Sequence, residues 1–297
     1  MRDAKLKFLV ILFTGLLVVN LYSQQETKPK NLEVYFLDVG QGDGAFLKTP
    51  NGKNILIDAG QCALEDDEFD AGKEIVIPFL VKQGITKIDC IVASHAHADH
   101  IGGLISIMKK YPVGEVLDTG FPYPSPVYTR FLQVIKLKKI KYKIVTRGEI
   151  LHWDADLSVE VLSPNTNQLF DDPNNNSIVL KITYKNVSFL FTGDMETSAE
   201  ESVLSNYKKS ELSAVILKVA HHGSRSSSTE DFLSAVSPEV AVMSVGRYNR
   251  FRLPHPTIVK RYNDFDIELH RTDKEGTIIV TTDGETYSLN AVGFSNR

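Results

Sequence analysis

Short apolar runs rich in β-branched and aromatic residues alternate along the chain with segments of helical periodicity. In the first half the apolar runs predict strands, and the amphipathic segments between them predict helices. The expected strands are 32–37, 44–48, 53–57, 88–94, 115–118 and 143–145, and the expected helices are 73–83, 103–111 and 126–138. Residues 163–176, rich in Pro, Asn and Asp, predict a turn-rich connector after this half.

The same alternation resumes after the connector. The expected strands are 177–184, 187–192, 214–219, 240–245, 267–271, 277–282 and 286–289, and the expected helices are 198–204, 230–234 and 257–265. Two strand-rich halves with helices between them predict an α/β fold, in which two sheets pack face to face with the helices outside. We therefore expect one domain built from two similar halves.

The first residues follow a different pattern. A basic start, an almost wholly apolar run over 8–19 and a polar stretch with a small residue at Ser23 are typical of a secretory signal peptide. We expect a signal peptide at 1–23, a linker at 24–31 and a single folded domain at 32–297, in a protein that is exported to the periplasm or secreted. The apolar run is short for a membrane span, and an uncleaved signal anchor is the alternative. No later apolar run approaches the roughly 20 residues that a span needs, so the mature chain should carry none.

Charge and cysteine content narrow the choice of partners. The net charge of −4 gives the chain no overall field to hold a polyanion, which weakens a nucleic-acid substrate without excluding it. The two cysteines, Cys62 and Cys90, lack metal-ligand spacing, and we expect free thiols. No feature of the sequence indicates a protein partner.

The segment from Ser94 to His100, with the sequence SHAHADH, carries the clearest chemistry. It places three imidazoles and a carboxylate between an apolar strand and a helical pattern, at the kind of strand end where α/β proteins hold their active sites. Neutral imidazole and carboxylate are ligands for zinc and manganese. A tight turn can aim His95 and His97 at one ion, and Asp99 and His100 at a second. Two such ions can hold a bridging hydroxide and clamp a phosphoryl or carbonyl group.

The segment His95–His100 matches the HxHxDH signature of the metallo-β-lactamase superfamily. Further segments are similar, in chain order, to the C-terminal hydrolase domain of ComEC-type competence proteins. They are FLDVGQGD at 36–43, LIDAG at 56–60, FTGD at 191–194, LKVAHHGS at 217–224, HP at 255–256 and RTD at 271–273. The resemblance covers about residues 32–290 and implies an αββα four-layer sandwich with hydrolase activity. The membrane channel of the ComEC proteins has no counterpart here, so a role in DNA uptake is not implied.

The resemblance also implies the remaining ligands. Asp194, after an apolar strand, is the carboxylate expected to bridge both ions, and one of His221 and His222 should complete the second ion, with a slight preference for His222. Asp58 is expected to support the metal histidines, and Asp38 to lie in a turn at the rim of the site. Asp43 is assigned the same rim position as Asp38.

Substrate contacts are expected in two segments. Hydroxyls, backbone N–H groups and a guanidinium before a helical pattern suit a substrate anion, although a plain helix cap is the alternative. The residues concerned are Ser224, Arg225, Ser226 and Ser227. His255 stands between two prolines, and the resemblance places this turn against the site. It is our candidate general acid, with a purely structural histidine as the alternative.

One departure from the zinc β-lactamases concerns the first ion. Those enzymes carry a third histidine there, whereas His152 is the one histidine between His100 and Asp194 and its surroundings predict a turn. ComEC-like domains have an Asn/Ser stretch at this point, matched by residues 175–177, and Asn176 is expected to support the site. Fewer imidazoles favour manganese without excluding zinc.

Together these patterns predict a hydrolase with two divalent metal ions, zinc or manganese, acting through the bridging hydroxide. A phosphodiesterase or nuclease is favoured, with Asp99 and His255 as catalytic residues and a small-molecule or nucleic-acid phosphodiester as substrate. A lactone, lactam or thioester hydrolase on the same fold is the first alternative. A metal-stabilised binding module without turnover is the second.

Overall fold

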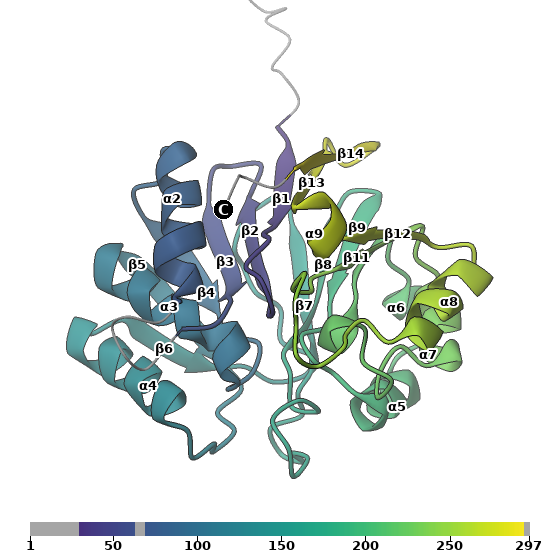
Figure 1. The fold of residues 1–297 in the computed structure, drawn as a ribbon, viewed down its shortest axis with the longest axis horizontal. Helices are drawn as coiled ribbons and strands as arrows, with labels where there is room; N and C mark the ends of the chain where they lie inside the picture. The colour runs from purple at the N-terminus through teal and green to yellow at the C-terminus, as the bar shows by residue number, and fades with distance from the viewer. Residues whose placement is uncertain (1–29, 63–68, 294–297) are drawn as a thin grey trace, which may run out of the picture. The chain divides into compact units, whose positions relative to one another are not determined.

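Two β-sheets take up the apolar runs of the sequence (Figure 1). The computed structural model describes residues 30–62 and 69–293, so the expected signal peptide at 1–23 and most of the linker at 24–31 lie outside the described residues. The larger sheet has the strand order β14-β13-β1-β2-β3-β4-β5-β6, and the smaller sheet has the order β12-β11-β10-β9-β8-β7.

The elements have the following bounds. The larger sheet comprises β1 (Leu32–Phe36), β2 (Gly44–Lys48), β3 (Asn54–Ala59), β4 (Ile88–Val92), β5 (Val113–Asp118), β6 (Lys141–Ile144), β13 (Thr277–Thr282) and β14 (Tyr287–Val292). The smaller sheet comprises β7 (Ser158–Ser163), β8 (Val179–Tyr184), β9 (Val187–Phe191), β10 (Ile216–Lys218), β11 (Val240–Met243) and β12 (Glu268–Arg271). The helices are η1 (Gly72–Val76), α2 (Ile77–Lys82), α3 (Ala98–Lys110), α4 (Pro126–Lys138), α5 (Thr197–Asn206), α6 (Lys209–Leu212), η2 (Ala220–Gly223), α7 (Glu230–Val236), α8 (Pro256–Asp264) and α9 (Thr272–Glu275).

Three apolar clusters order these elements as helix, sheet, sheet, helix. The central cluster joins the inner faces of the two sheets, and within it the rings of Phe36 and Phe191 stack with centroids 5.6 Å apart. A second cluster packs η1, α2, α3 and α4 on the outer face of the larger sheet. A third packs α5, α7 and α8 on the outer face of the smaller sheet (Figure 1). The αββα four-layer sandwich is therefore confirmed.

The last hairpin differs from the expected division into halves. The strands expected at 277–282 and 286–289 were grouped with the second half of the chain, but β13 pairs antiparallel with β1 and extends the sheet of the first half. Local patterning shows that a segment is a strand but not which strand it pairs with. The first strand, β1, and the last two strands, β13 and β14, are therefore neighbours in the larger sheet.

Helix α3 begins five residues earlier than the expected start at 103. Two glycines, Gly102 and Gly103, lie inside this helix although glycine is a poor helix former. In the fold they permit close packing: a Cβ on Gly103 would lie 2.1 Å from the carbonyl oxygen of Ala59. As a result, Asp99 and His100 lie on the first turn of α3 rather than in a loop.

Two further expectations concern membrane spans and the cysteines. Over residues 30–62 and 69–293, no helix combines the length and apolar character needed to cross a bilayer. Cys62 and Cys90 are both free, as expected.

Candidate metal centre

Three chain segments that follow strands bring imidazoles and carboxylates together at one edge of the two sheets. His95 and His97 follow β4, and Asp99 follows them in the first turn of α3. Asp194 follows β9, and the two histidines of the HHGS segment follow β10, which runs parallel to β9. Parallel strands end at the same edge of a sheet, which brings the segments after β9 and β10 together in the smaller sheet. The segment after β4, in the larger sheet, joins them through the contacts of His95 and His100 with Asp194.

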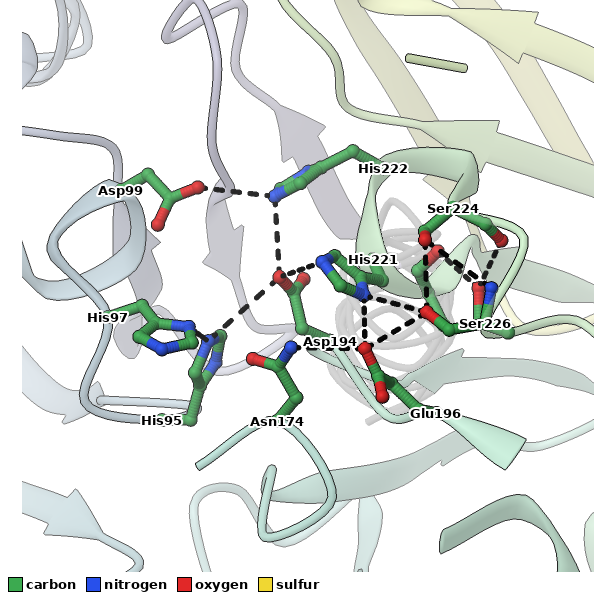
Figure 2. Close-up of polar contacts among 12 residues, drawn as sticks. His95, His97, Asp99, Asn174, Asp194, Glu196, His221, His222, Ser224 and Ser226 are labelled. Carbon is green, nitrogen blue, oxygen red and sulfur yellow. Dashed lines mark hydrogen bonds and ion pairs between the residues drawn. The ribbon is translucent and has the colours of Figure 1, made fainter. Parts of the chain in front are cut away.

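One oxygen of Asp194 lies at the centre of this group (Figure 2). Its Oδ2 atom is 3.2 Å from Nε2 of His100 and 3.5 Å from Nε2 of His222. The same oxygen is 3.7 Å from Nε2 of His221 and 3.9 Å from Nε2 of His95. Asp194 is buried, which opposes its ionisation, but the surrounding imidazoles outweigh burial and lower its pKa well below the usual range.

His100 is held from behind by a buried carboxylate. Nδ1 of His100 lies 2.8 Å from Oδ2 of Asp58, and Asp58 also accepts hydrogen bonds from the backbone N–H and the hydroxyl of Ser94. This contact fixes the ring so that Nε2 faces Asp194. Burial lowers the pKa of His100, but Asp194 and Asp58 outweigh it and raise the pKa well above the ordinary value. Burial raises the pKa of Asp58.

His222 is held by a different set of contacts. Its Nδ1 lies 3.0 Å from the carbonyl oxygen of Ser244 and 3.3 Å from Oδ1 of Asp43, and its Nε2 lies 3.5 Å from Oδ2 of Asp99. Burial opposes the charged imidazole, but the carboxylates around it raise the pKa of His222 to about 10. Asp43, expected as a turn residue at the rim, is buried instead and forms an ion pair with Lys218 at 2.7 Å. We find no signal for this position in the DVGQGD segment itself.

The backbone of the HHGS turn is strained. His221 and His222 have φ angles of 48° and 52°, in the left-handed region that non-glycine residues rarely adopt. Each such residue costs about 1–3 kcal/mol, and strain of this kind is typical of functional sites. Because of this turn, His221 contacts Glu196 while His222 contacts Asp99.

His221 contacts a second polar group beside Asp194 (Figure 2). Its Nδ1 lies 2.9 Å from Oε1 of Glu196, which also accepts hydrogen bonds from Ser226 at 2.9 Å and from the amide of Asn174 at 3.2 Å. Glu196 and Asn174 were not among the expected site residues. Their signal was weak, because Glu196 stands two residues beyond the FTGD segment and Asn174 lies in the connector.

His95 and His97 lie together on the side of the group that is expected to hold the first ion. Nδ1 of His97 lies 2.9 Å from Nε2 of His95, and burial lowers the pKa of both rings, which keeps them neutral. Asn176 is buried and its amide donates to the carbonyl oxygens of Phe170 and Asp172, so it braces the connector. Asn174, two residues earlier, is the amide that the structure places beside Glu196.

The remaining expected residues lie around this group. His255 is the N-cap of α8, with Nδ1 2.7 Å from the hydroxyl of Thr257 and its backbone N–H donating to the carbonyl of Gly223. Asp38 accepts from the backbone N–H of Gly40 in the turn after β1. In the serine segment, Ser224 contacts Ser226, Ser227 donates to backbone carbonyls of its own turn, and Arg225 is exposed. The helix cap is Thr229 rather than one of these serines.

The donors fit the binding of divalent metal. Nε2 of His100, Nε2 of His222 and Oδ1 of Asp194 are buried and have no hydrogen-bond partner among the residues that the structure describes. Buried polar atoms are otherwise almost always paired. Among the described residues, four donor sets have their ligand atoms within 4.8 Å of one another, and two of them are His95–His100–Asp194 and Asp99–His100–His222. Imidazole and carboxylate are the donors that zinc, manganese and iron accept.

Comparison with known proteins agrees with this geometry. The family described as the metallo-beta-lactamase superfamily matches residues 37–247. The chain belongs to the metallo-beta-lactamase superfamily. Among solved structures, CmlA, a diiron β-hydroxylase from Streptomyces venezuelae, superimposes with a TM-score of 0.52 over 82% of this chain and 53% of that one, at 13% identity. This likeness supports the metallo-beta-lactamase fold.

Relatives within the superfamily place the chain near competence proteins. It is 34% identical over 259 residues to ComE operon protein 3 of Bacillus subtilis, covering 83% of this chain and 32% of that protein. It is 31% identical over 255 residues to Competence protein ComA of Neisseria gonorrhoeae, covering 85% of this chain and 33% of that protein. The resemblance to ComEC-like domains is therefore confirmed. The chain spans about a third of the length of the curated relatives it matches.

The two adjacent histidines of this metallo-beta-lactamase domain should respond differently to substitution. We expect His222→Gln to lower the bound-metal content, because His222 faces Asp99 and Asp194. His221→Gln should keep the wild-type metal content, because the nearest carboxylate to His221 is Glu196. Metal content after dialysis, measured by plasma mass spectrometry, checks this. Equal loss in both variants would contradict the assignment.

Proposed function

We propose that this metallo-beta-lactamase domain is a metal-dependent phosphodiesterase with two divalent ions, zinc or manganese. The observation that carries the proposal is the buried carboxylate oxygen of Asp194, which has four imidazoles within 3.9 Å. A carboxylate oxygen enclosed by imidazoles is suited to be the anionic ligand that two cations share. Divalent ions there supply activation of water near neutral pH and neutralise the charge of a phosphoryl group.

The proposed ligands divide between two ions. His95 and His97 would hold one, Asp99, His100 and His222 would hold the other, and Asp194 would contact both. Asp58 orients His100 and Asp43 orients His222, so the ligand nitrogens are fixed before an ion arrives.

Other residues would act on the substrate. Arg225 is exposed beside the centre and suits a phosphate oxygen, with Ser224 and Ser226 in the same turn. We propose His255 as the general acid acting through Nε2, because Nδ1 contacts the hydroxyl of Thr257.

The substrate class rests on the donor set and on the relatives. The position of the third histidine of the zinc β-lactamases is taken by the Asn-rich connector, which counts against a lactamase. The matched relatives bear names that refer to competence and, in Haemophilus influenzae, to recombination, at 31% identity. Both processes act on nucleic acid, so we propose a phosphodiester as the substrate of this chain.

We also propose that the protein is exported to the periplasm or the medium, on the basis of residues 1–23.

A substrate screen tests the proposal. The purified chain is stripped with a chelator, reloaded with Zn²⁺ or Mn²⁺, and assayed on bis-p-nitrophenyl phosphate, nitrocefin and a lactone. We expect hydrolysis of the phosphodiester alone, at least about 100-fold above the chelated protein, because the bound ions stabilise the phosphoryl transition state.

Two results would decide against it. Turnover of nitrocefin or the lactone with no phosphodiester hydrolysis would assign a different hydrolase. Full metal loading with no turnover of any substrate would favour the binding module.

A further inference from the structure

An exposed loop with three arginines and two aromatic rings borders the metal centre. Residues 246–254 connect β11 to α8 and have the sequence GRYNRFRLP. Tyr248 is 94% exposed and Phe251 is 55% exposed. Both rings are therefore accessible to a ligand at this loop.

The loop lines a groove that reaches the metal centre. The groove has a volume of about 470 Å³, and one wall is formed by Tyr248, Asn249, Arg250 and Phe251. Asp99, a proposed ligand, and Gln41 also line the groove. A phosphodiester whose phosphorus lies at the ions would therefore extend its next group along this loop.

The base of the loop is held firmly while its tip is exposed. The backbone N–H of Gly246 donates to Oε1 of Gln41, and a Cβ on Gly246 would lie 2.7 Å from the backbone nitrogen of Gln41. The side chain of Asn249 bonds to the carbonyls of Gly246 and Leu253 and accepts from the N–H of Leu253. These hydrogen bonds fix the loop backbone around the aromatic residues before a ligand binds.

The chemistry of the tip suits an unpaired nucleobase. The guanidinium of Arg250 lies 5.1 Å from the ring centroid of Phe251, so a cationic and an aromatic surface are adjacent. Bases stack on aromatic rings and guanidinium planes, and arginines bind the neighbouring phosphates. A base within a duplex has its faces covered and cannot stack in this way. The loop also supplies the local positive charge that the net charge of −4 does not.

We propose that Tyr248, Arg250 and Phe251 form a stacking subsite for an unpaired nucleobase of the substrate. The inference rests on the proposed function, because the base would belong to the phosphodiester that reaches Asp99. It narrows the substrate from phosphodiesters in general to single-stranded nucleic acid or its short fragments.

Binding without turnover tests the subsite. The chelated full chain is titrated into a fluorescein-labelled eight-residue oligothymidylate and into a duplex of the same length, and anisotropy is recorded. We expect the wild type to bind the single strand at least about fivefold more tightly than the duplex. The double variant Tyr248→Ala/Phe251→Ala should weaken single-strand binding by between about 5-fold and 100-fold.

Matched variants separate stacking from general effects. Tyr248→Phe keeps the ring and should keep the affinity within about twofold. Leu137→Ala removes another exposed apolar side chain, 80% exposed on α4, and should leave binding unchanged. The substituted tip residues are exposed, so circular dichroism should show the wild-type fold in every variant.

Several results would overturn the subsite. They are equal affinity for strand and duplex, unchanged affinity in the double variant, or no binding by the wild type. A concentration-dependent dimer that the double variant disrupts, seen by sedimentation, would assign the rings to an interface between copies instead. Hydrolysis of bis-p-nitrophenyl phosphate by the wild type is scored separately, so the proposed function can fail while the subsite stands, and the reverse.

Discussion

Replacing Asp194 with asparagine should abolish turnover and remove bound metal while leaving the fold intact. The substitution keeps the shape of the side chain but removes the charge from the one oxygen that four imidazoles face. Two cations held without that anion would repel each other at short range, so both should be lost on dialysis. We expect the hydrolysis rate on bis-p-nitrophenyl phosphate to fall by more than about 1,000-fold.

The measurement pairs the rate with the metal content of the same preparation. Asp264→Asn is the control, because Asp264 is an exposed carboxylate on α8 whose contact is with Lys260. That variant should keep the wild-type rate and both ions. An Asp194→Asn protein with full metal content and an undiminished rate would show that the reacting centre lies elsewhere.

The fold was largely predictable because its signals are local. Strands 44–48 and 277–282 and helix 126–138 agree with the structure to the residue, since each combines a clear period with a turn residue or proline at its boundary. The joining of β13 to β1 was not predictable, because it depends on contacts between segments about 245 residues apart. The start of α3 was expected five residues too late, and the close packing of Gly103 against Ala59 at this point is again a contact between distant segments.

The candidate site divides in the same way. The candidate ligands could be predicted from the HxHxDH and HHGS segments, because the residues of each segment are close together in the sequence. The residues that support them come from elsewhere in the chain. Glu196 contacts His221, and the amide beside Glu196 is that of Asn174 rather than Asn176. Both contacts depend on how the connector lies against the turn after β9. No spacing rule in the sequence specifies that fold.

Lys218 was part of a recognised segment, yet its role was missed. It stands in the apolar run Ala214–Val219, and a lysine within a buried strand is rare unless it is paired. In the structure it is 4% exposed, and its ammonium group lies 2.7 Å from Oδ2 of Asp43 and donates to the carbonyl of Val219. Asp43 in turn contacts His222, so this pair lies directly behind the metal centre.

Lys218→Met should therefore destabilise the metal-free protein by about 3–5 kcal/mol. Methionine fills a similar volume, but it leaves the buried carboxylate of Asp43 without its ammonium partner. Burial opposes ionisation of Asp43, while Lys218 and His222 outweigh it and lower the pKa of that carboxyl. A lowered carboxyl pKa contributes stability that is present above its ordinary value near 4 and is lost as the pH falls further. The free energy of unfolding in urea at pH 7 measures the effect.

A double variant shows whether the charge is the cause. Lys218→Met/Asp43→Asn removes both charges, so it should recover most of the stability that Lys218→Met loses, because no buried charge is left unpaired. If the double variant is instead as unstable as the sum of the two single variants, Lys218 stabilises the fold by packing alone. Recovery of stability without recovery of metal affinity would separate the two roles of Asp43, since the neutral asparagine needs no ammonium partner but cannot polarise the imidazole of His222 as a carboxylate does.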